Sequence, residues 1–435
     1  MTRGGRQLLL LSFFFLQPTL HVASLLRRQQ PSQEFDDYRH FKQHLTDGLS
    51  STDGQEPAQH HAVSLVQSCF EAAPLAQNNS ALLIVSSNNS THYHAARECH
   101  IHRPLRPGAE DYRPLQQLIV QPTTAAETAV LVQCVAAAKK QHARHMTISV
   151  RSGAHGFTGD ACRGDVILDM SRMYDNTDGV QVDRTTQQVT WSAGLLHGQV
   201  YAPLWQDHGL VLPGGAEMMV GTGGLWLGCG RGRLANVYGM TCEHLRGIEF
   251  IDAEGRVQWA DATTNADMFW MARGGGGTFP GIVTKFKAQA YPMDVDLVYK
   301  EKCTFVNTPA NIKALVRTFL DHLNGINDST RRSFVALSAF RLEAGFKFLC
   351  FGCSLQQLRE LNDFKETLLR SVQKISPMAQ ATCHDQYHSY EGYMLHETTW
   401  DDYLTPEDFQ KRSLWPEWLN VSMVSIRKLL DFLTM

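Results

Sequence analysis

The sequence has 435 residues, of which 43% are hydrophobic and 19% are charged, and its formal net charge is -3 at pH 7. This balance is ordinary for a globular protein, and the length allows two domains with sizeable cores. Because no excess of basic residues creates a positive field, the composition argues against nucleic acid and anionic membranes as partners.

The first 24 residues predict a secretory signal peptide. Arg3 and Arg6 precede the apolar run 8–16, and small residues follow at 22–24. The alternative is a membrane anchor, but an anchor needs roughly 20 apolar residues, and Gln17 and Pro18 interrupt this run. We therefore expect residues 1–24 to be cleaved and the chain to be secreted without stable membrane insertion.

Two further features are typical of a secreted glycoprotein. The ten cysteines would meet an oxidising compartment in which some can pair, although spacing alone leaves the pairs open. Acceptor sequons for N-glycosylation occur at Asn78, Asn88, Asn89, Asn327 and Asn420.

The elements begin after a polar segment, residues 25–60, which predicts a loosely ordered lead-in. Short apolar runs then predict strands at 82–85, 118–120 and 147–150.

A helix is expected between the last two of these strands. Thr124 and Glu127 form a capping box, helically spaced apolar residues follow, and the lysines at 139–140 suit the last turn. The strand at 147–150 runs straight into a loop, 151–159, which is where a strand-helix-strand unit binds ligands.

The rest of this region reads as mixed helix and strand. A domain boundary is expected after Pro292, where glycine becomes sparse. Alternating apolar residues predict strands at 166–169, 180–182 and 189–191, a helix at 195–207, and a hairpin from 248–252 to 256–260.

Glycine-rich segments carry the candidate chemistry. Glycine lets backbone N–H groups approach a diphosphate closely, although each segment alone could simply make a tight turn. The segments are 151–159, 221–232, 273–277 and 281–283.

Together and in this order they resemble the FAD-binding domain of the vanillyl-alcohol oxidase superfamily, within it the berberine bridge enzyme-like and oligosaccharide oxidase group. The resemblance covers residues 69–292. The family motifs R-S-G-G-H, D-L-S-R-M and Y-G-L correspond to residues 151–155, 169–173 and 238–240, which read R-S-G-A-H, D-M-S-R-M and Y-G-M here. The other matches are the glycine stretch at 220–232, D-x-x-G-x-V at 252–257, N-x-D-x-F-W at 265–270, and R-G-G-G-G with G-I-V at 273–283.

The resemblance implies an α+β fold. A two-subdomain PCMH-type FAD-binding domain would occupy residues 61–292, and a partial substrate domain, an antiparallel sheet with helices, would occupy 293–435. Matching the motifs residue by residue, the FAD-binding positions are Arg151, Ser152, Gly153, Ala154, His155, Gly156, Gly159, Gly221, Gly223, Gly224, Gly228, Gly232, Tyr238, Gly239, Glu243, Gly281 and Val283.

His155 is the position that the resemblance marks for a covalent bond to the 8α carbon of the flavin, with non-covalent packing as the alternative. Many members of the group attach the flavin a second time through a cysteine, but Glu217 stands in its place here. A single attachment is therefore expected.

Other departures and implications concern neighbouring positions. Ala154 replaces a glycine, which matters little if its φ is negative and is costly if its φ is positive. Glu243 replaces an aspartate. The resemblance also implies a disulfide between Cys69 and Cys134, with two buried thiols as the alternative.

Two cysteine and histidine pairs have the spacing of metal ligands, but no metal site is expected. Cys350 and Cys353 form a C-x-x-C without a second pair, which favours structural cysteines over a zinc or redox site. His384 and His388 lie four residues apart, but no third ligand can be named for them.

The region after 292 predicts helices at 309–323 and 355–372 and a strand within 341–353. Residues 411–413 and a helix at 421–433 resemble a family element. Family members continue beyond the position of Met435 and supply a catalytic tyrosine or glutamate there, so no catalytic residue is assigned. Either the chain is truncated, or the domain binds FAD without the chemistry, or a tyrosine substitutes: Tyr387, Tyr390 or Tyr393.

The sequence thus predicts a secreted FAD-dependent oxidase. By resemblance, a hydroxyl-bearing small molecule such as an oligosaccharide would reduce the flavin, and molecular oxygen would reoxidise it to give hydrogen peroxide. The alternative is an inert or degenerate flavin-binding protein.

Overall fold

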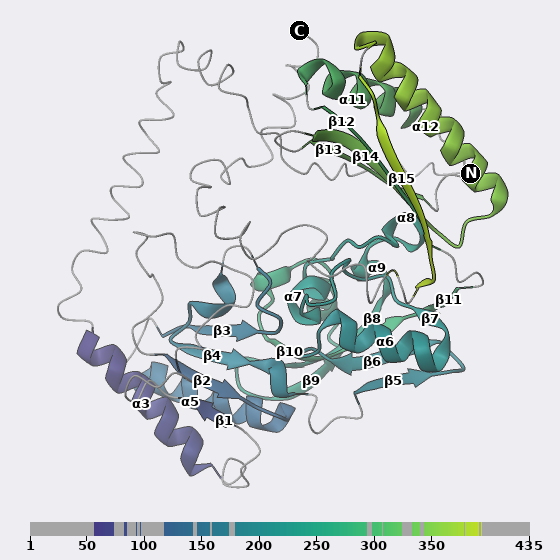
Figure 1. Ribbon diagram of the computed structural model, residues 1–435. Coiled ribbons are helices and arrows are strands. Elements are labelled where there is room, and N and C mark those ends of the chain that lie inside the picture. Colours follow the sequence, from purple (N-terminus) through teal and green to yellow (C-terminus); the bar gives the residue numbers. More distant parts are fainter. Residues whose placement is uncertain are drawn as a thin grey trace. The chain divides into compact units, whose positions relative to one another are not determined.

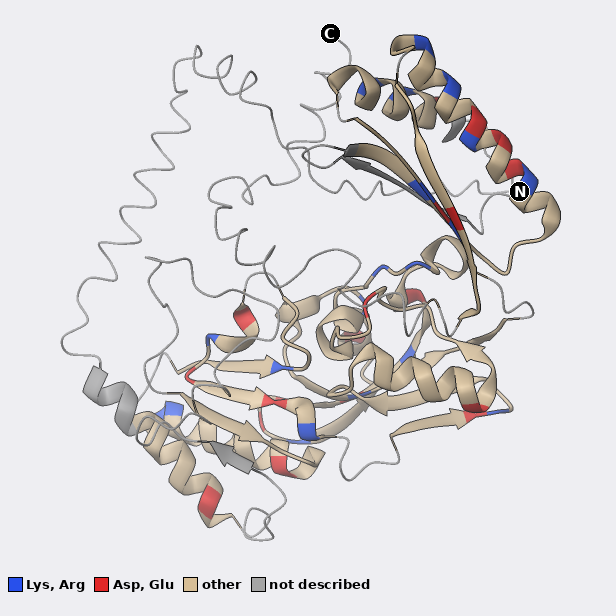
Figure 2. Cartoon of the chain, in the orientation of Figure 1, with Lys and Arg blue, Asp and Glu red and all other residues tan. Residues whose placement is uncertain are grey.

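The computed structural model describes residues 56–73, 82–84, 93, 96, 117–141, 146–156, 159–173, 179–293, 298–306, 308–323, 333–339, 343–377, 379–390 and 393. They form two compact units, one ending at Met293 and the other running from Val298 to Tyr393 (Figure 1). Charged residues of both signs are scattered over the described elements (Figure 2). The expected signal peptide, the sequon asparagines and the segment 411–433 lie outside the described residues.

The first unit begins with a four-stranded sheet in the order β1-β2-β4-β3. Strands β2, β4 and β3 are parallel, and β1 is antiparallel to β2. The strand bounds are β1 Leu82–Ile84, β2 Leu118–Gln121, β3 Ile148–Arg151 and β4 Val166–Asp169. Each matches a strand predicted from an apolar run, and no bound differs from the prediction by more than one residue.

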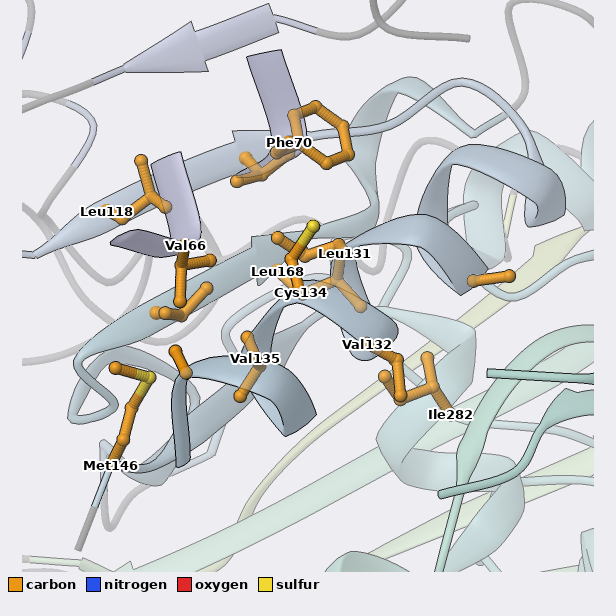
Figure 3. Close-up of a cluster of buried hydrophobic side chains, with 14 of the residues drawn as sticks. Val66, Phe70, Leu118, Leu131, Val132, Cys134, Val135, Met146, Leu168 and Ile282 are labelled. Carbon is orange, nitrogen blue, oxygen red and sulfur yellow. The ribbon is translucent and has the colours of Figure 1, made fainter. Parts of the chain in front are cut away.

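Two helices, α3 (Glu56–Ala72) and α5 (Ala125–Gln141), share a core with this sheet. Figure 3 shows side chains of α3, α5, β2 and β4 gathered in one cluster. Among its members are Val66, Phe70, Leu118, Leu131, Val135 and Leu168.

The capping box predicted for α5 is present. Thr124 Oγ1 accepts from the Glu127 N–H at 3.1 Å, and Glu127 Oε2 accepts from the Thr124 N–H at 3.2 Å. Helix α3 was not predicted. Its apolar residues Val63, Val66 and Phe70 are buried at helical spacing. Its first residues, 56–60, fall within the segment expected to be loosely ordered, and that expectation is wrong there.

The second sheet of this unit is antiparallel, in the order β5-β6-β10-β8-β9. A two-stranded ladder joins β7 (Leu210–Val211) to β11 (Tyr291–Pro292). The five strands are β5 Val180–Asp183, β6 Gln188–Ser192, β8 Leu245–Ile251, β9 Val257–Ala260 and β10 Ile282–Gln289. The predicted 248–260 hairpin is β8 and β9.

Short helices follow the strands of this sheet. The longest is α6, which begins at His197 and not at the predicted Leu195. The bounds are α6 His197–His208, α7 Thr222–Leu227, α8 Ala235–Tyr238, α9 Thr241–His244 and α10 Ala266–Met271, with 3₁₀ turns η2 Asp160–Cys162, η3 Met170–Arg172 and η4 Gly276–Thr278.

The second unit is an antiparallel sheet in the order β13-β14-β12-β15, with two helices packed on it. The predicted helices are α11 (Pro309–Leu323) and α12 (Leu355–Ile375). Their shared core includes Phe319, Phe346, Phe348, Phe364 and Leu368. The strands are β12 Val298–Val306, β13 Ser333–Ala339, β14 Glu343–Phe351 and β15 Thr382–His388.

Disulfides reinforce both units. The pair implied by the resemblance, Cys69–Cys134, is bonded and ties α3 to α5. Other described pairs are Cys229–Cys242, Cys303–Cys383 and Cys350–Cys353. Glu301 lies close to the sulfurs of Cys303 and Cys383, but a disulfide has no thiolate to offer a metal.

His384 and His388 do not form a metal pair. They lie on strand β15, where four residues span about 13 Å at 3.3 Å per residue. An i,i+4 pair converges on one ion only on a helix. Within the described residues, no helix is both long and apolar enough to cross a membrane.

Candidate functional site

The loop after β3 starts from a buried ion pair. Arg151 donates through Nη2 to Asp169 Oδ2 at 2.8 Å and through Nη1 to the carbonyl of Ala96 at 2.7 Å. The Arg151 and Asp169 side chains are only 7% and 8% exposed. Because β3 and β4 are adjacent, this pair holds the first residue of the loop to the end of β4.

The same loop touches the glycine segment that precedes α7. A Cβ added to Gly153 would overlap the backbone of Gly221, and one added to Gly221 would overlap that of Gly153. Ser152 Oγ donates to the Ala193 carbonyl at 2.8 Å and accepts from the Gly223 N–H at 3.4 Å. Three segments distant in sequence therefore meet here through main chain and one hydroxyl.

Ala154 and His155 occupy the centre of this loop. Ala154 has φ 49°. This is the positive-φ case, in which replacing glycine by alanine is costly, because a residue with a Cβ is disfavoured in the left-handed conformation. His155 follows and is half-buried. Gly156 and Gly159 have open space where a Cβ would stand, and Gly159 has φ 73°.

A tight turn at residues 217–220 lies against the start of α6. The Val220 N–H donates to the Glu217 carbonyl at 3.3 Å, which closes the turn. The first N–H groups of α6 are then satisfied by this turn: His197 donates to the Val220 carbonyl at 2.9 Å and Gly198 to the Met218 carbonyl at 3.0 Å. The turn is thus fixed by the helix terminus.

His197 is fully buried within this contact. Its Nδ1 lies 3.3 Å from the Glu217 carbonyl oxygen, and its ring stacks on Tyr201 with centroids 5.2 Å apart. Burial lowers the pKa of His197 to about 4; the bond with Glu217 opposes this shift, and the nearby His155 adds to it. His197 is therefore neutral at pH 7.

Glu217 is half-buried on the same turn. Burial raises the pKa of the Glu217 carboxyl, while the backbone N–H groups of Met219 and Met218 and the charge of Arg233 act to lower it. Glu217 Oε1 is buried and has no hydrogen-bond partner among the described residues.

Helix α7 is anchored to the antiparallel sheet by its tryptophan. Trp226 packs edge-on against Trp191 of β6, with ring centroids 4.8 Å apart, and Trp191 stacks on Phe286 of β10. The Thr222 N–H donates to the Leu195 carbonyl at 2.9 Å. Gly221, Gly223 and Gly224 are therefore held on a rigid base.

The downstream glycine segments continue from α7. Gly228 ends this helix, and its Cα lies 3.7 Å from a Cβ built on Gly276. Gly232 is packed against the Gly214 backbone so closely that a Cβ would overlap it. The Cys229–Cys242 disulfide links this stretch to α9.

Tyr238, Gly239 and Glu243 form a second cluster in α8 and α9. Tyr238 stacks on Tyr291 with ring centroids 4.5 Å apart. Glu243 Oε2 accepts from the Met240 N–H at 2.6 Å. A Cβ on Gly239, whose φ is 102°, would overlap the Glu243 carboxyl.

Gly281 and Val283 lie on the sheet itself. Gly281 packs against the Ile251 carbonyl, and Val283 is buried on β10 opposite Phe250. The structure thus unites the 151–156 loop with Gly221 and Gly223. It places Val283 in the β8–β10 ladder and Gly281 directly before β10.

Sequence reasoning missed one residue of this site. His197 precedes a glycine at the start of a helix, and nothing in its local pattern distinguishes it from a surface histidine. Glu217 was noted only as the replacement of a cysteine. The three tyrosines considered as substitute bases lie in the second unit: Tyr387 is 59% exposed, while Tyr390 and Tyr393 are buried.

The residues present fit a large cofactor with a polar ring and phosphates. At Gly153 and Gly221 the two backbones fill the space that a side chain would need, so the two segments meet without a side chain between them. Two buried polar atoms, His197 Nε2 and Glu217 Oε1, have no described protein partner. Such atoms are rare in native proteins unless a ligand or water meets them.

Comparisons with known proteins agree with this architecture. Residues 116–261 match the FAD binding domain family. The chain is 29% identical over 238 residues to the FAD-linked oxidoreductase srdI of Neurospora crassa, covering 52% of this chain and 45% of that protein. It is 30% identical over 182 residues to berberine bridge enzyme-like 19 of Arabidopsis thaliana, covering 40% and 30%. The match spans under half the length of either relative.

Solved structures show the same fold. The glucooligosaccharide oxidase of Acremonium strictum, which carries a 6-S-cysteinyl, 8α-N1-histidyl FAD, aligns with a TM-score of 0.60 and 22% identity, covering 78% of this chain and 63% of that one. A xylooligosaccharide oxidase of Myceliophthora thermophila C1 aligns with a TM-score of 0.59 and 17% identity, covering 77% and 63%.

Proposed function

We propose a function for this chain on three findings. Residues 116–261 match the FAD binding domain family, the α+β fold is that of PCMH-type oxidases, and the chain is related to FAD-linked oxidoreductases and berberine bridge enzyme-like proteins. It is an FAD-dependent oxidase of hydroxyl-bearing small molecules, with oligosaccharides as the substrate class and molecular oxygen as the acceptor, giving hydrogen peroxide. A bound flavin supplies a two-electron acceptor for the hydride of the carbon that bears the hydroxyl.

The observation that carries this proposal is the contact between the His155 loop and the Gly221 segment. Both segments approach main chain to main chain, and both are pinned, one by the Arg151–Asp169 pair and the other by Trp226. Such a rigid junction suits a cofactor that is bound by backbone groups and anchored at one histidine.

We assign the covalent link to the His155 imidazole. Ser152, Gly153, Gly221 and Gly223 lie at the same junction and would hold the cofactor beside it. Because Glu217 has no nucleophilic sulfur, the flavin would have one protein attachment, and the double attachment of the Acremonium enzyme would not form.

The oligosaccharide class is proposed from the fold neighbours, whose titles name oligosaccharides. We place the FAD-binding domain at residues 61–292 and the substrate domain at 293–435. In the second domain an antiparallel sheet backed by α11 and α12 would supply a surface for the sugar. The disulfides of both units support secretion.

The flavin link is tested by denaturation. Purified protein is precipitated with acid, and the yellow colour should stay with the pellet of the wild type. His155→Ala should release it into the supernatant, whereas His384→Ala, which changes a histidine on the exposed strand β15, should not. Colour that leaves the wild-type pellet contradicts the covalent bond.

The oxidase activity needs a separate assay. Oligosaccharides and aromatic alcohols are added without oxygen. We then record whether the absorption of the oxidised flavin, at roughly 450 nm, decreases. Peroxide is then measured in air. A flavin-containing protein that neither bleaches nor makes peroxide would be an inert flavin-binding protein.

A further inference from the structure

The 217–220 turn presents a carboxyl from a backbone that has little freedom. The turn is closed by its own hydrogen bond and is held by two N–H groups of α6. Leu196 pairs with Gly221 immediately beyond it, and Gly221 in turn meets Gly153. Glu217 therefore sits on the segment that touches the His155 loop.

The hydrogen-bonding pattern settles the tautomer of His197. A carbonyl oxygen can only accept, so the Nδ1 that faces the Glu217 carbonyl carries the proton. In a neutral imidazole the other nitrogen is then a bare acceptor. That atom, Nε2, is buried and lacks a partner among the described residues.

Glu217 Oε1 is likewise buried and has no hydrogen-bond partner among the described residues. A buried polar atom loses its water without a replacement, which is unfavourable unless a ligand supplies the missing bond. Two such atoms, one on Glu217 and one on the residue that bonds its carbonyl, lie at the same turn, which suits a polar ligand surface.

We propose that the Glu217 carboxyl contacts the flavin ring as a titratable group, and that His197 is the positioning residue that holds it there. This inference rests on the proposed function, because it takes the junction of His155 and Gly221 as the flavin site. In this proposal, a non-covalent polar contact from Glu217 takes the place of the second covalent bond.

The charged and titratable neighbours define the electrostatics of this contact. Arg233 acts on Glu217, and His155 acts on His197. A change in Glu217 ionisation places or removes a full negative charge beside the ring, and charge near a flavin alters its absorption and redox potential.

The test is a pH titration of the flavin absorption in protein loaded with FAD. The wild type should show a spectral transition whose midpoint lies above the ordinary range of a glutamate. Glu217→Gln keeps the shape of the side chain but cannot ionise. This variant should lose the transition while retaining its flavin. Glu254→Gln, a change in an exposed turn, should keep it.

His197 is tested by two replacements. Asparagine can still donate near the position of Nδ1, so His197→Asn should keep the midpoint within about 0.3 pH units, a shift equivalent to about 0.4 kcal/mol. Leucine cannot donate, so His197→Leu should move the midpoint by one unit or more. A purely structural role would affect both variants alike.

The outcomes separate the two proposals. A wild type that binds no FAD contradicts the proposed function. If FAD is bound but the wild type shows no transition, or Glu217→Gln keeps it, the inference about Glu217 is wrong and the proposed function stands. If Glu217→Gln does not fold, Glu217→Met gives the same comparison, since it also fills the site without a proton.

Discussion

The backbone of Gly153 lies directly against the backbone of Gly221, so a loop and a helix start that are far apart in sequence meet without an intervening side chain. This contact joins the parallel sheet, where β3 ends, to the segment that leads into α7. The site is therefore made by two subdomain edges, and neither edge alone contains it.

Gly153→Ala should separate these edges. The added Cβ would overlap the main chain of Gly221, which cannot move as a flexible side chain would. Overpacking of this kind costs about 1–3 kcal/mol, so unfolding in urea should shift to lower denaturant. Gly277→Ala is the control, since nothing lies within 4 Å of its added Cβ; equal stability of the two variants would contradict the contact.

Asp169→Asn should be strongly destabilising. It removes the negative charge that faces the buried Arg151 guanidinium at 2.8 Å, and breaking a buried ion pair on one side costs about 3–5 kcal/mol. Asp160→Asn removes an exposed pair with Arg163, whose side chains are 54% and 71% exposed, and should change stability by less than about 1 kcal/mol. Chemical denaturation of both variants measures the contrast.

Removing a disulfide should lower the free energy of unfolding, and the loss should be larger for the disulfide that closes the longer loop. Replacing Cys69 and Cys134 together by alanine releases a separation of 65 residues, and replacing Cys229 and Cys242 releases 13. Chain entropy predicts losses of about 4 and about 3 kcal/mol. Thermal unfolding under oxidising conditions gives the two values, and a larger loss for the short loop would contradict this ordering.

The free energy of unfolding should fall as pH is lowered through the titration of His197. Its pKa is 6.5 when exposed and about 4 when buried in the fold. The unfolded chain therefore takes up the proton first, and stability is lost between about pH 6.5 and 4, by at most roughly 3 kcal/mol. In His197→Asn this part of the pH dependence should vanish; denaturant titrations at pH 7, 5.5 and 4.5 show whether it does.

Much of the first unit could be predicted from the sequence because its signals are local. The Thr124–Glu127 capping box marks the start of α5 with the expected hydrogen bonds, and short apolar runs between turn residues mark β2, β3 and β4. Helix α3 was not predicted, although Val63, Val66 and Phe70 recur at helical spacing; its first residues, 56–60, lie in the polar segment that was expected to be loosely ordered.

What a spacing implies also depends on the type of element in which it occurs. His384 and His388 suggest a pair if the segment is a helix, but β15 extends there and separates them. The cost of Ala154 likewise depends on the folded backbone. It is set by the sign of φ at that residue, which the amino-acid sequence alone does not give.

By itself, the sequence determined the order of the glycine segments, the position of His155 within its motif, and the replacement of a cysteine by Glu217, because these are properties of a linear pattern. Only the tertiary structure decided that Gly153 meets Gly221, that α6 caps the 217–220 turn, and that His197 is buried with one nitrogen that no described residue contacts by a hydrogen bond. Those relationships arise when two sheets and a helix terminus pack together, and burial, which sets the protonation of His197, exists only in the folded chain.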